Sequence, residues 1–334
     1  MIIVNRVERA GASGEEPRLE RHKLAPGIAV APDVIWIDLV QPTREEDLQI
    51  EAYLGITVPT REEMKDIEPS NLLYVEDGAH FMTARIVTHM DADEDAKLAA
   101  VTFVLKDHKL LTVRYDEPRP FVMYAARASR PGNCGLSGEA ILAGLIETIS
   151  DRAAEILRQV GERVDALSVQ VFAGARARRS RTGDTYRATL GTLGFEGDRV
   201  SKVRESLVSI ERMLLFLAAN SSVARTPGDL RAQARTTIRD LQSLEDHASF
   251  LNNKIQFLLD ATLGLVALEQ NDIIKLFSVI SVVMMPPTLI ASIYGMNFKV
   301  MPELEWSSGY PIALALMITA AAVPYLFFRI KRWL

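Results

Sequence analysis

The chain has 334 residues, a formal net charge of −5 and a hydrophobic content of 48%. A chain of this length has room for more than one domain, and its slightly acidic balance gives no overall attraction for nucleic acid. The single cysteine, Cys134, excludes an intrachain disulfide and a cysteine metal cluster within one chain. The first residues carry no long apolar segment and no cleavage site, so we expect no signal peptide and a mostly cytoplasmic chain.

Residues 1–135 have the pattern of a cytoplasmic α/β domain. Thr43, with Glu46 three residues later, is a capping-box signal that predicts a helix through about Leu54. The acidic run at 91–95 is typical of a solvated hairpin loop. Apolar or alternating runs, with a turn at 107–109, predict strands over 34–39, 79–89, 99–105 and 110–115.

Residues 136–228 predict a helical hairpin region. Apolar residues recur at steps of three and four between 141 and 167, and a second amphipathic helix is expected over 198–219. An arginine-rich stretch at 176–181 separates the two patterns, and we expect it to be a flexible surface link.

A single long helix is predicted after the break at 226–229, where Asp229 is a candidate N-cap. No proline follows until Pro286, so the helix is expected to run over about 230–293, a length of about 95 Å. Its residues 229–272 are expected to form a cytoplasmic stalk.

Two uncharged runs near the C-terminus predict two membrane-spanning helices. The expected segments are a first span, 273–293, an external loop, 294–309, a second span, 310–328, and a basic tail, 329–334. The loop has Lys299 against Glu303 and one further acid, whereas three basic residues follow the second span. By the positive-inside rule the C-terminus lies in the cytoplasm, and two spans then place the N-terminus there too.

A stripe at alternating steps of four and three runs along the stalk and the first span. Its members are Asp260, Gly264, Ala267, Asn271, Ile274, Ser278, Ser281, Met285, Thr288 and Ser292. This is the spacing of a coiled-coil seam, but most of its residues are small or polar. Packed dry in lipid they would leave hydroxyls and amides poorly satisfied, whereas identical helices around a watery axis would satisfy them.

The spacing alone does not decide between a pore and a packing face, because tight helix pairing also uses small residues. Phe277 lies one position off the stripe and would narrow a channel beside Ile274, as would Met285.

The first span ends in YGMN at 294–297, and MPEL follows at 301–304. These motifs resemble the signature of the CorA family of magnesium transport proteins. The likeness is strongest over 271–334, and weaker matches lie upstream in WIDL at 36–39 and DIEPS at 66–70.

The resemblance implies a funnel-shaped homopentamer with cytoplasmic α/β/α domains around a mixed sheet, a long stalk helix from each subunit and a two-span membrane domain. The helical region at 136–228 would complete the funnel, and the first spans would line a pore. Such a protein carries Mg²⁺, and in some members Co²⁺ or Ni²⁺, inward across the cell (inner) membrane. Its partners are further copies of itself, the lipid bilayer and divalent cations, with no nucleic acid and no organic cofactor.

The same resemblance assigns roles to residues of the pore. Asn297 would form an outer selectivity ring, presented by Gly295 and Met296, and Phe277 would form a hydrophobic constriction. The remaining expected pore-lining residues are Asn271, Ile274, Ser278, Ser281, Met285, Thr288 and Ser292. Magnesium sheds water reluctantly, so amide oxygens could hold the hydrated ion through its waters without trapping it.

A regulatory divalent site is the other implication of the family. Asp260 on the stalk and Asp66 in the N-terminal domain of a neighbouring subunit match its two carboxylates, with Glu68 as a weaker candidate. Cytoplasmic Mg²⁺ bridging Asp66 and Asp260 would hold the pore shut, and its loss would let like charges separate. Mg²⁺ is thus expected as both the transported and the regulatory ion.

Two residues depart from the family pattern. Lys299 stands where many members carry an acid, and a cation there lowers the local concentration of divalent ions. Pro287 follows Pro286 where the usual run is Met-Pro-Leu.

Three other functions fit the sequence less well. A zinc or other transition-metal transporter of the same superfamily, with proton coupling, is the nearest, but MPEL favours magnesium and the five histidines lack ligand spacing. A membrane-anchored coiled-coil scaffold would need an apolar seam, which Asp260, Gly264 and Asn271 interrupt. An enzyme is not indicated, because the sequence has no nucleophile with a base, no P-loop and no dinucleotide fingerprint.

Overall fold

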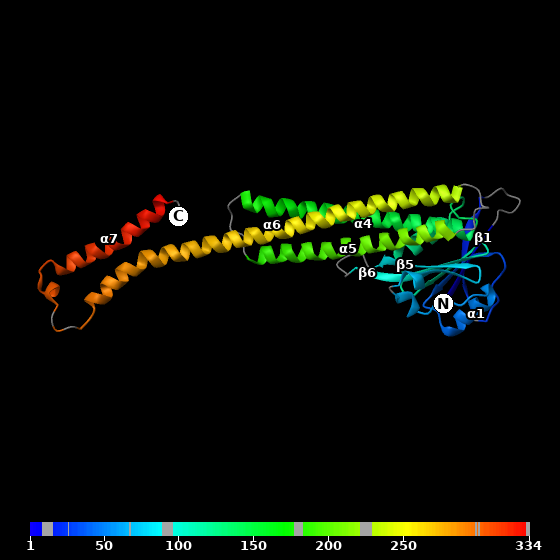
Figure 1. Ribbon diagram of the computed structural model, residues 1–334, viewed down its shortest axis with the longest axis horizontal. Coiled ribbons are helices and arrows are strands. Elements are labelled where there is room, and N and C mark those ends of the chain that lie inside the picture. Colours follow the sequence, from blue (N-terminus) through cyan, green and yellow to red (C-terminus); the bar gives the residue numbers. More distant parts are fainter. Residues whose placement is uncertain are drawn as a thin grey trace. The chain divides into compact units, whose positions relative to one another are not determined.

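The computed structural model describes residues 1–8, 16–25, 27–66, 68–88, 96–176, 183–220, 229–297, 299 and 301–331 (Figure 1). The acidic run at 91–95, most of the arginine-rich link and the break at 226–228 lie outside these residues. The chain divides into two compact units. The first comprises Met1–Gln170 and Thr189–Leu258, and the second comprises Val171–Ala188 and Leu259–Leu334.

A seven-stranded mixed sheet lies in the first unit, in the order β2-β1-β3-β7-β6-β5-β4. The strands are β1 Ile2–Glu8, β2 Arg18–Leu24, β3 Val34–Val40, β4 Leu73–Glu76, β5 Ala79–Thr88, β6 Lys97–Lys106 and β7 Lys109–Arg114. The predictions for β3, β5, β6 and β7 are confirmed, and β1, β2 and β4 were not predicted. Strands β3 and β7 pair in parallel, with Trp36 opposite Leu110, and all other neighbours are antiparallel.

The turn between β6 and β7 is the predicted one. Asp107 and His108 have φ angles of 48° and 61°, the left-handed pair that a two-residue hairpin requires. The carbonyl of His108 accepts a hydrogen bond of 2.7 Å from the backbone N–H of Gly138. A Cβ on Gly138 would lie 2.5 Å from the backbone nitrogen of Leu110, so this close approach requires glycine.

The two faces of the sheet have different helical covers. Helix α1, Arg44–Leu54, begins with the predicted capping box between Thr43 and Glu46, and its Ile50 is buried against the sheet. Helix α3, Arg119–Ala128, packs on the other face, where the ring of Phe121 lies 6.5 Å from that of Trp36. The short elements η1, Glu63–Lys65, and α2, Pro69–Leu72, complete the α/β/α arrangement.

Three long helices follow: α4 Gly138–Arg176, α5 Gly183–Asn220 and α6 Asp229–Tyr294. Helix α5 starts 15 residues before the predicted 198. Its early part contains Gly191, Gly194 and Gly197, which lower helix propensity. Packing overrides that preference: a Cβ on Gly197 would lie 3.6 Å from Ile255 of α6. The prediction of one unbroken helix through Pro286 is confirmed by α6.

The second unit contains the C-terminal part of α6 from Leu259 onward, which we call outer α6. It also contains the short helix η2, Pro302–Glu305, and α7, Gly309–Ile330. In the described chain, two helices are long and apolar enough to cross a membrane, over Ala234–Tyr294 and Gly309–Ile330. They contain the two predicted spans. Prolines lie inside both helices, and neither helix is broken at them.

Candidate pore and metal sites

The stripe predicted on α6 lies on an exposed face of the chain. All ten of its positions, from Asp260 to Ser292, are exposed. Among the large apolar residues, Ile274 is 55% exposed, Met285 is 68% exposed and the neighbouring Phe277 is 65% exposed. The stripe is therefore available to contact other copies or water along its whole length.

The buried side of outer α6 faces away from this stripe. Val279 is only 3% exposed, and Lys275 and Val283, one turn to either side, are half-buried. At about 100° per residue, Ile274, Ser281 and Thr288 lie about half a turn around the helix from Val279. On α7 the buried residue is Ala313, at 9%. The chain thus buries one side of α6 and leaves the polar side open.

The hydroxyl groups on the stripe are better satisfied than the sequence suggested. Ser278 donates to the carbonyl of Ile274 and Thr288 donates to that of Met284, both at 2.8 Å. The expectation that these hydroxyls need an aqueous axis is wrong for these two residues, because a helix accepts such bonds internally. Among the described residues, the Asn271 amide and the hydroxyls of Ser281 and Ser292 have no hydrogen-bond partner, so a polar environment would satisfy these three side chains.

The tripeptide Gly295-Met296-Asn297 directly follows the end of α6. The N–H of Gly295 donates to the carbonyl of Ala291 at 3.0 Å, and that of Met296 donates to Ile293 at 3.2 Å. A Cβ on Gly295 would lie 3.2 Å from the Ala291 oxygen, so a side chain there would crowd this last turn. Asn297 and Lys299 are exposed beyond it. Glu303 belongs to η2.

The candidate regulatory carboxylates differ in their surroundings. Asp66 accepts hydrogen bonds from the N–H of Glu68 at 3.2 Å and from the side-chain amide of Asn71 at 2.7 Å. It therefore also acts as a local cap between η1 and α2. Asp260 and Glu68 are exposed. In the described part of one chain, no three His, Cys, Asp or Glu side chains gather closely enough to hold a metal.

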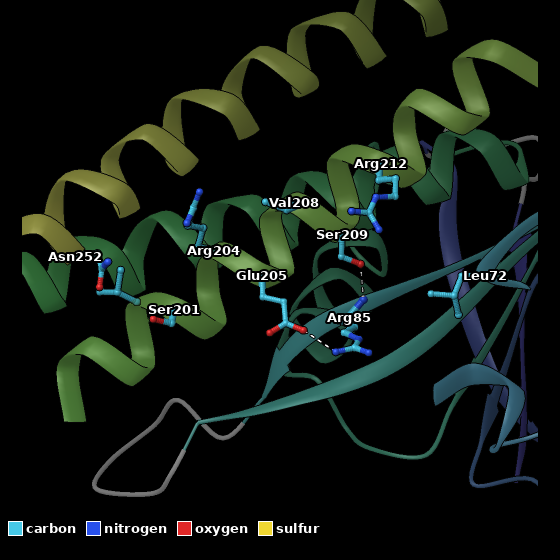
Figure 2. Close-up of a pocket in the computed structure, with 10 residues that line it drawn as sticks. Leu72, Arg85, Ser201, Arg204, Glu205, Val208, Ser209, Arg212 and Asn252 are labelled. Atoms are coloured by element: carbon cyan, nitrogen blue, oxygen red, sulfur yellow. Dashed lines mark hydrogen bonds and ion pairs between the residues drawn. The ribbon is translucent and has the colours of Figure 1, made fainter. Parts of the chain in front are cut away.

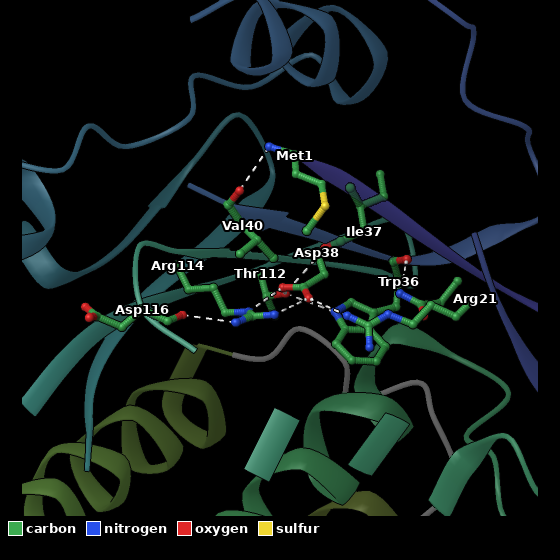
Figure 3. Close-up of polar contacts among 10 residues, drawn as sticks. Met1, Arg21, Trp36, Ile37, Asp38, Val40, Thr112, Arg114 and Asp116 are labelled. Atoms are coloured by element: carbon green, nitrogen blue, oxygen red, sulfur yellow. Dashed lines mark hydrogen bonds and ion pairs between the residues drawn. The ribbon is translucent and has the colours of Figure 1, made fainter. Parts of the chain in front are cut away.

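The upstream WIDL motif is part of a buried polar network (Figure 3). Asp38 accepts hydrogen bonds from Arg114 and from the hydroxyl of Thr112, the latter at 2.8 Å. The indole N–H of Trp36 donates to the same hydroxyl at 3.0 Å. Arg21 approaches Asp38 to 3.7 Å. The motif therefore links strands β3 and β7, and its partner Arg114 was not predicted.

Comparison with known proteins decides the family. A family model described as CorA-like Mg²⁺ transporter protein matches residues 32–332. The chain belongs to the CorA family. It is 40% identical over 301 residues to the magnesium transport protein CorA of Yersinia pseudotuberculosis, covering 90% of this chain and 92% of that protein.

Two solved structures with low sequence identity to this chain have the same fold. The CorA magnesium transporter from Methanocaldococcus jannaschii aligns with a TM-score of 0.75 and 18% identity, covering 100% of this chain and 99% of that chain. The cytoplasmic domain of ZntB from Vibrio parahaemolyticus aligns with a TM-score of 0.54 and 12% identity, covering 80% of this chain and 98% of that domain. The predicted fold, a mixed-sheet domain with a long helix and two apolar helices, is confirmed. CorA proteins are transporters rather than enzymes, as the sequence indicated.

Proposed function

We propose that this CorA protein carries Mg²⁺ into the cell through a homopentameric pore lined by α6. The observation that carries the proposal is the exposed, mostly small and polar stripe on α6, which leads directly to Gly295, Met296 and Asn297. The magnesium transport protein of Yersinia, 40% identical, supports the choice of ion. The two apolar helices support a location in the cell membrane. The basic residues that follow the second helix favour an orientation with both termini in the cytoplasm.

Five copies of α6 would turn the exposed stripe toward a shared axis. The Asn271 amide would then form hydrogen bonds with water at this axis. The opposite side of α6, which contains Val279, would pack against other helices. Rings of Ile274, Phe277 and Met285 would form apolar constrictions that close by dewetting. The hydroxyls of Ser278 and Thr288, which donate within the helix, would still offer lone pairs to the hydrated ion.

Asn297 would select the ion at the outer mouth. Its exposed amide follows a helix end fixed by the backbone bonds of Gly295 and Met296. A ring of neutral amides can bind the waters of a hydrated magnesium ion, whereas a ring of carboxylates would hold the ion too tightly for conduction.

Gating would come from Mg²⁺ bound between Asp260 of one subunit and Asp66 of its neighbour. Asp66 already accepts hydrogen bonds from Glu68 and Asn71, so the metal would share its carboxylate with these donors, directly or through water. Glu68, which is exposed two residues later, would add a further carboxylate ligand. Loss of the ion would leave like charges that repel and would favour an open stalk.

Flux measurements on reconstituted protein test the proposal. Vesicles containing the full chain should take up Mg²⁺ in response to an inside-negative potential. The variant Asn297→Ala should lose this Mg²⁺ uptake or lose its preference for Mg²⁺ over other cations. Native mass spectrometry should find five copies. Uptake of Zn²⁺ driven by a pH gradient, with no Mg²⁺ uptake, would instead support the zinc alternative. A monomeric or dimeric protein in lipid would contradict the pore.

A further inference from the structure

A groove in the first unit carries more positive charge than its own acids neutralise. Its volume is about 390 Å³, and it lies along α5 and β5 (Figure 2). Its charged lining consists of Arg85 from β5 and of Arg204, Glu205 and Arg212 from α5. We call this feature the arginine groove. It does not contain any residue of the proposed pore.

Arg85 is held in a fixed position at the groove. Its guanidinium pairs with Glu205 at 2.6 Å, and its backbone N–H donates to the hydroxyl of Ser209 at 2.8 Å. The Ser209 hydroxyl keeps its own hydrogen for another acceptor. The strand and the helix are thereby fastened together, with a cation at the junction.

Arg204 and Arg212 remain open to a ligand. Both are exposed, and neither forms an ion pair with any residue in the described part of the chain. Burial raises the pKa of Glu245, and the nearby positive charge of Arg204 lowers this pKa by less than burial raises it. With Glu205 engaged by Arg85, the groove has two guanidinium groups that form no ion pair with a carboxylate of the described residues.

A second cavity of about 150 Å³ shares Arg85 with the groove in its lining. It adds Arg61, Lys65 and Asp116 to the charged lining, and the Arg61 guanidinium lies 5.2 Å from the centre of the Tyr115 ring. Across the two cavities, cations outnumber carboxylates, and the excess comes from β5, α5 and the segment around η1. Three separate parts of the chain thus contribute positive charge to the linings of these two cavities.

We propose that the arginine groove binds a small phosphate-bearing anion, with its phosphate oxygens on Arg212, Arg204 and the anchored Arg85. Guanidinium groups present forked donors that match phosphate oxygens, and the hydroxyl of Ser209 adds a donor at the same wall. The cavity is larger than one phosphate group needs, so orthophosphate, pyrophosphate and nucleoside polyphosphates share the required chemistry. Binding would fasten α5 to β5 more firmly. The inference is independent of the proposed transport.

Calorimetric titration of the purified full chain tests this site. The titrants are orthophosphate, pyrophosphate and ATP, each in magnesium-free buffer with a chelator, so that binding of the anion is separated from binding of Mg²⁺. The test variant is Arg204→Gln with Arg212→Gln, both at exposed positions. The control, Arg235→Gln with Arg239→Gln, removes the same charge from exposed positions of α6 that do not line the groove.

Saturable binding of at least one titrant is expected, weakened about tenfold or more in the test variant and unchanged in the control. Tighter binding of ATP than of pyrophosphate would identify a nucleotide, and equal binding would identify the phosphate groups alone. Absence of saturable binding, or equal loss in both variants, would overturn the proposal. Dissociation of the assembly in the test variant alone, with no loss of anion binding, would show that the groove is instead an interface between copies.

Discussion

Asp38 and Arg114 form a buried, two-pronged ion pair across the parallel strands β3 and β7. Nε and Nη2 of Arg114 donate to the two carboxylate oxygens of Asp38, each at 3.0 Å. The side chains are 1% and 3% exposed, respectively. Arg114 also lies over the ring of Phe121, 5.0 Å from its centre. The pair links the central strands of the sheet to α3.

Removal of one partner should be far more damaging than removal of both. Arg114→Ala leaves the carboxylate of Asp38 buried without its main partner, and the expected cost is about 3–5 kcal/mol in the free energy of unfolding. The double variant Asp38→Leu with Arg114→Met should recover part of that loss, because no unpaired charge remains. Thermal unfolding of the purified full chain measures both effects.

An exposed ion pair in the same sheet provides the control for that experiment. Arg6 and Glu20 lie 3.0 Å apart with side chains 44% and 36% exposed. Arg6→Ala should cost less than about 1 kcal/mol. Equal losses for Arg6→Ala and Arg114→Ala would show that burial of the Asp38 pair does not matter.

The capping box of α1 predicts a loss of stability in acid. Burial alone would raise the pKa of Glu46, but hydrogen bonds from the Met1 ammonium and from the N–H of Thr43 outweigh it, and the pKa lies below its ordinary 4.5. The ionised form is therefore favoured by folding, so this stability is present above about pH 4.5 and is lost as the pH falls through the lower folded pKa.

Glu46→Gln should lower the free energy of unfolding by about 1 kcal/mol at pH 7, and the difference from the unchanged protein should shrink in acid. Thermal unfolding at a series of pH values measures it. Glu45→Gln, an exposed change in the same turn, serves as control. A difference between Glu46→Gln and the parent that stays constant from pH 7 to acid would exclude this account.

A charge at the outer mouth should affect uptake at low magnesium. Lys299 is exposed two residues after Asn297. In the proposed pentamer, Lys299→Glu exchanges a repelling charge for an attracting one in every subunit, so the apparent KM for Mg²⁺ should fall about threefold to tenfold at low ionic strength. The effect should fade at high salt. Lys331→Glu, the same exchange beyond the other end of α7, should leave the KM unchanged.

Elements with strong local signals could be predicted from the sequence, and those that depend on distant partners could not. Residues close by in the sequence determine the capping box, the 107–108 turn and the unbroken α6. Strand β2 escaped prediction because four of its seven residues, RLERHKL, are charged, which an edge strand tolerates. Arg114 is 76 residues from Asp38, and no periodicity connects the two. The arginine groove likewise brings together residues that lie far apart along the chain.

Asp66 has two proposed roles, as a local cap and as a metal ligand, and the two roles predict different effects of Asp66→Ala and Asp66→Asn. Its carboxylate caps the segment before α2 by accepting from the N–H of Glu68 and the amide of Asn71. Asp66→Ala removes both acceptors and should cost about 1 kcal/mol of stability. Asp66→Asn keeps an acceptor oxygen for the N–H of Glu68 and should cost less.

For the proposed regulatory role, Asp66→Ala and Asp66→Asn should have the same effect. Both Asp66 variants remove the negative charge, so both should weaken inhibition of flux by cytoplasmic Mg²⁺, as should Asp260→Asn on the exposed stalk. The measurement is magnesium uptake by vesicles loaded with increasing internal Mg²⁺, alongside thermal unfolding of each variant. Glu62→Gln, an exposed acid just before η1, is the control. If Asp66→Asn and Asp260→Asn kept full sensitivity to internal Mg²⁺ while Asp66→Ala alone lost stability, Asp66 would be a cap and the metal bridge would be ruled out.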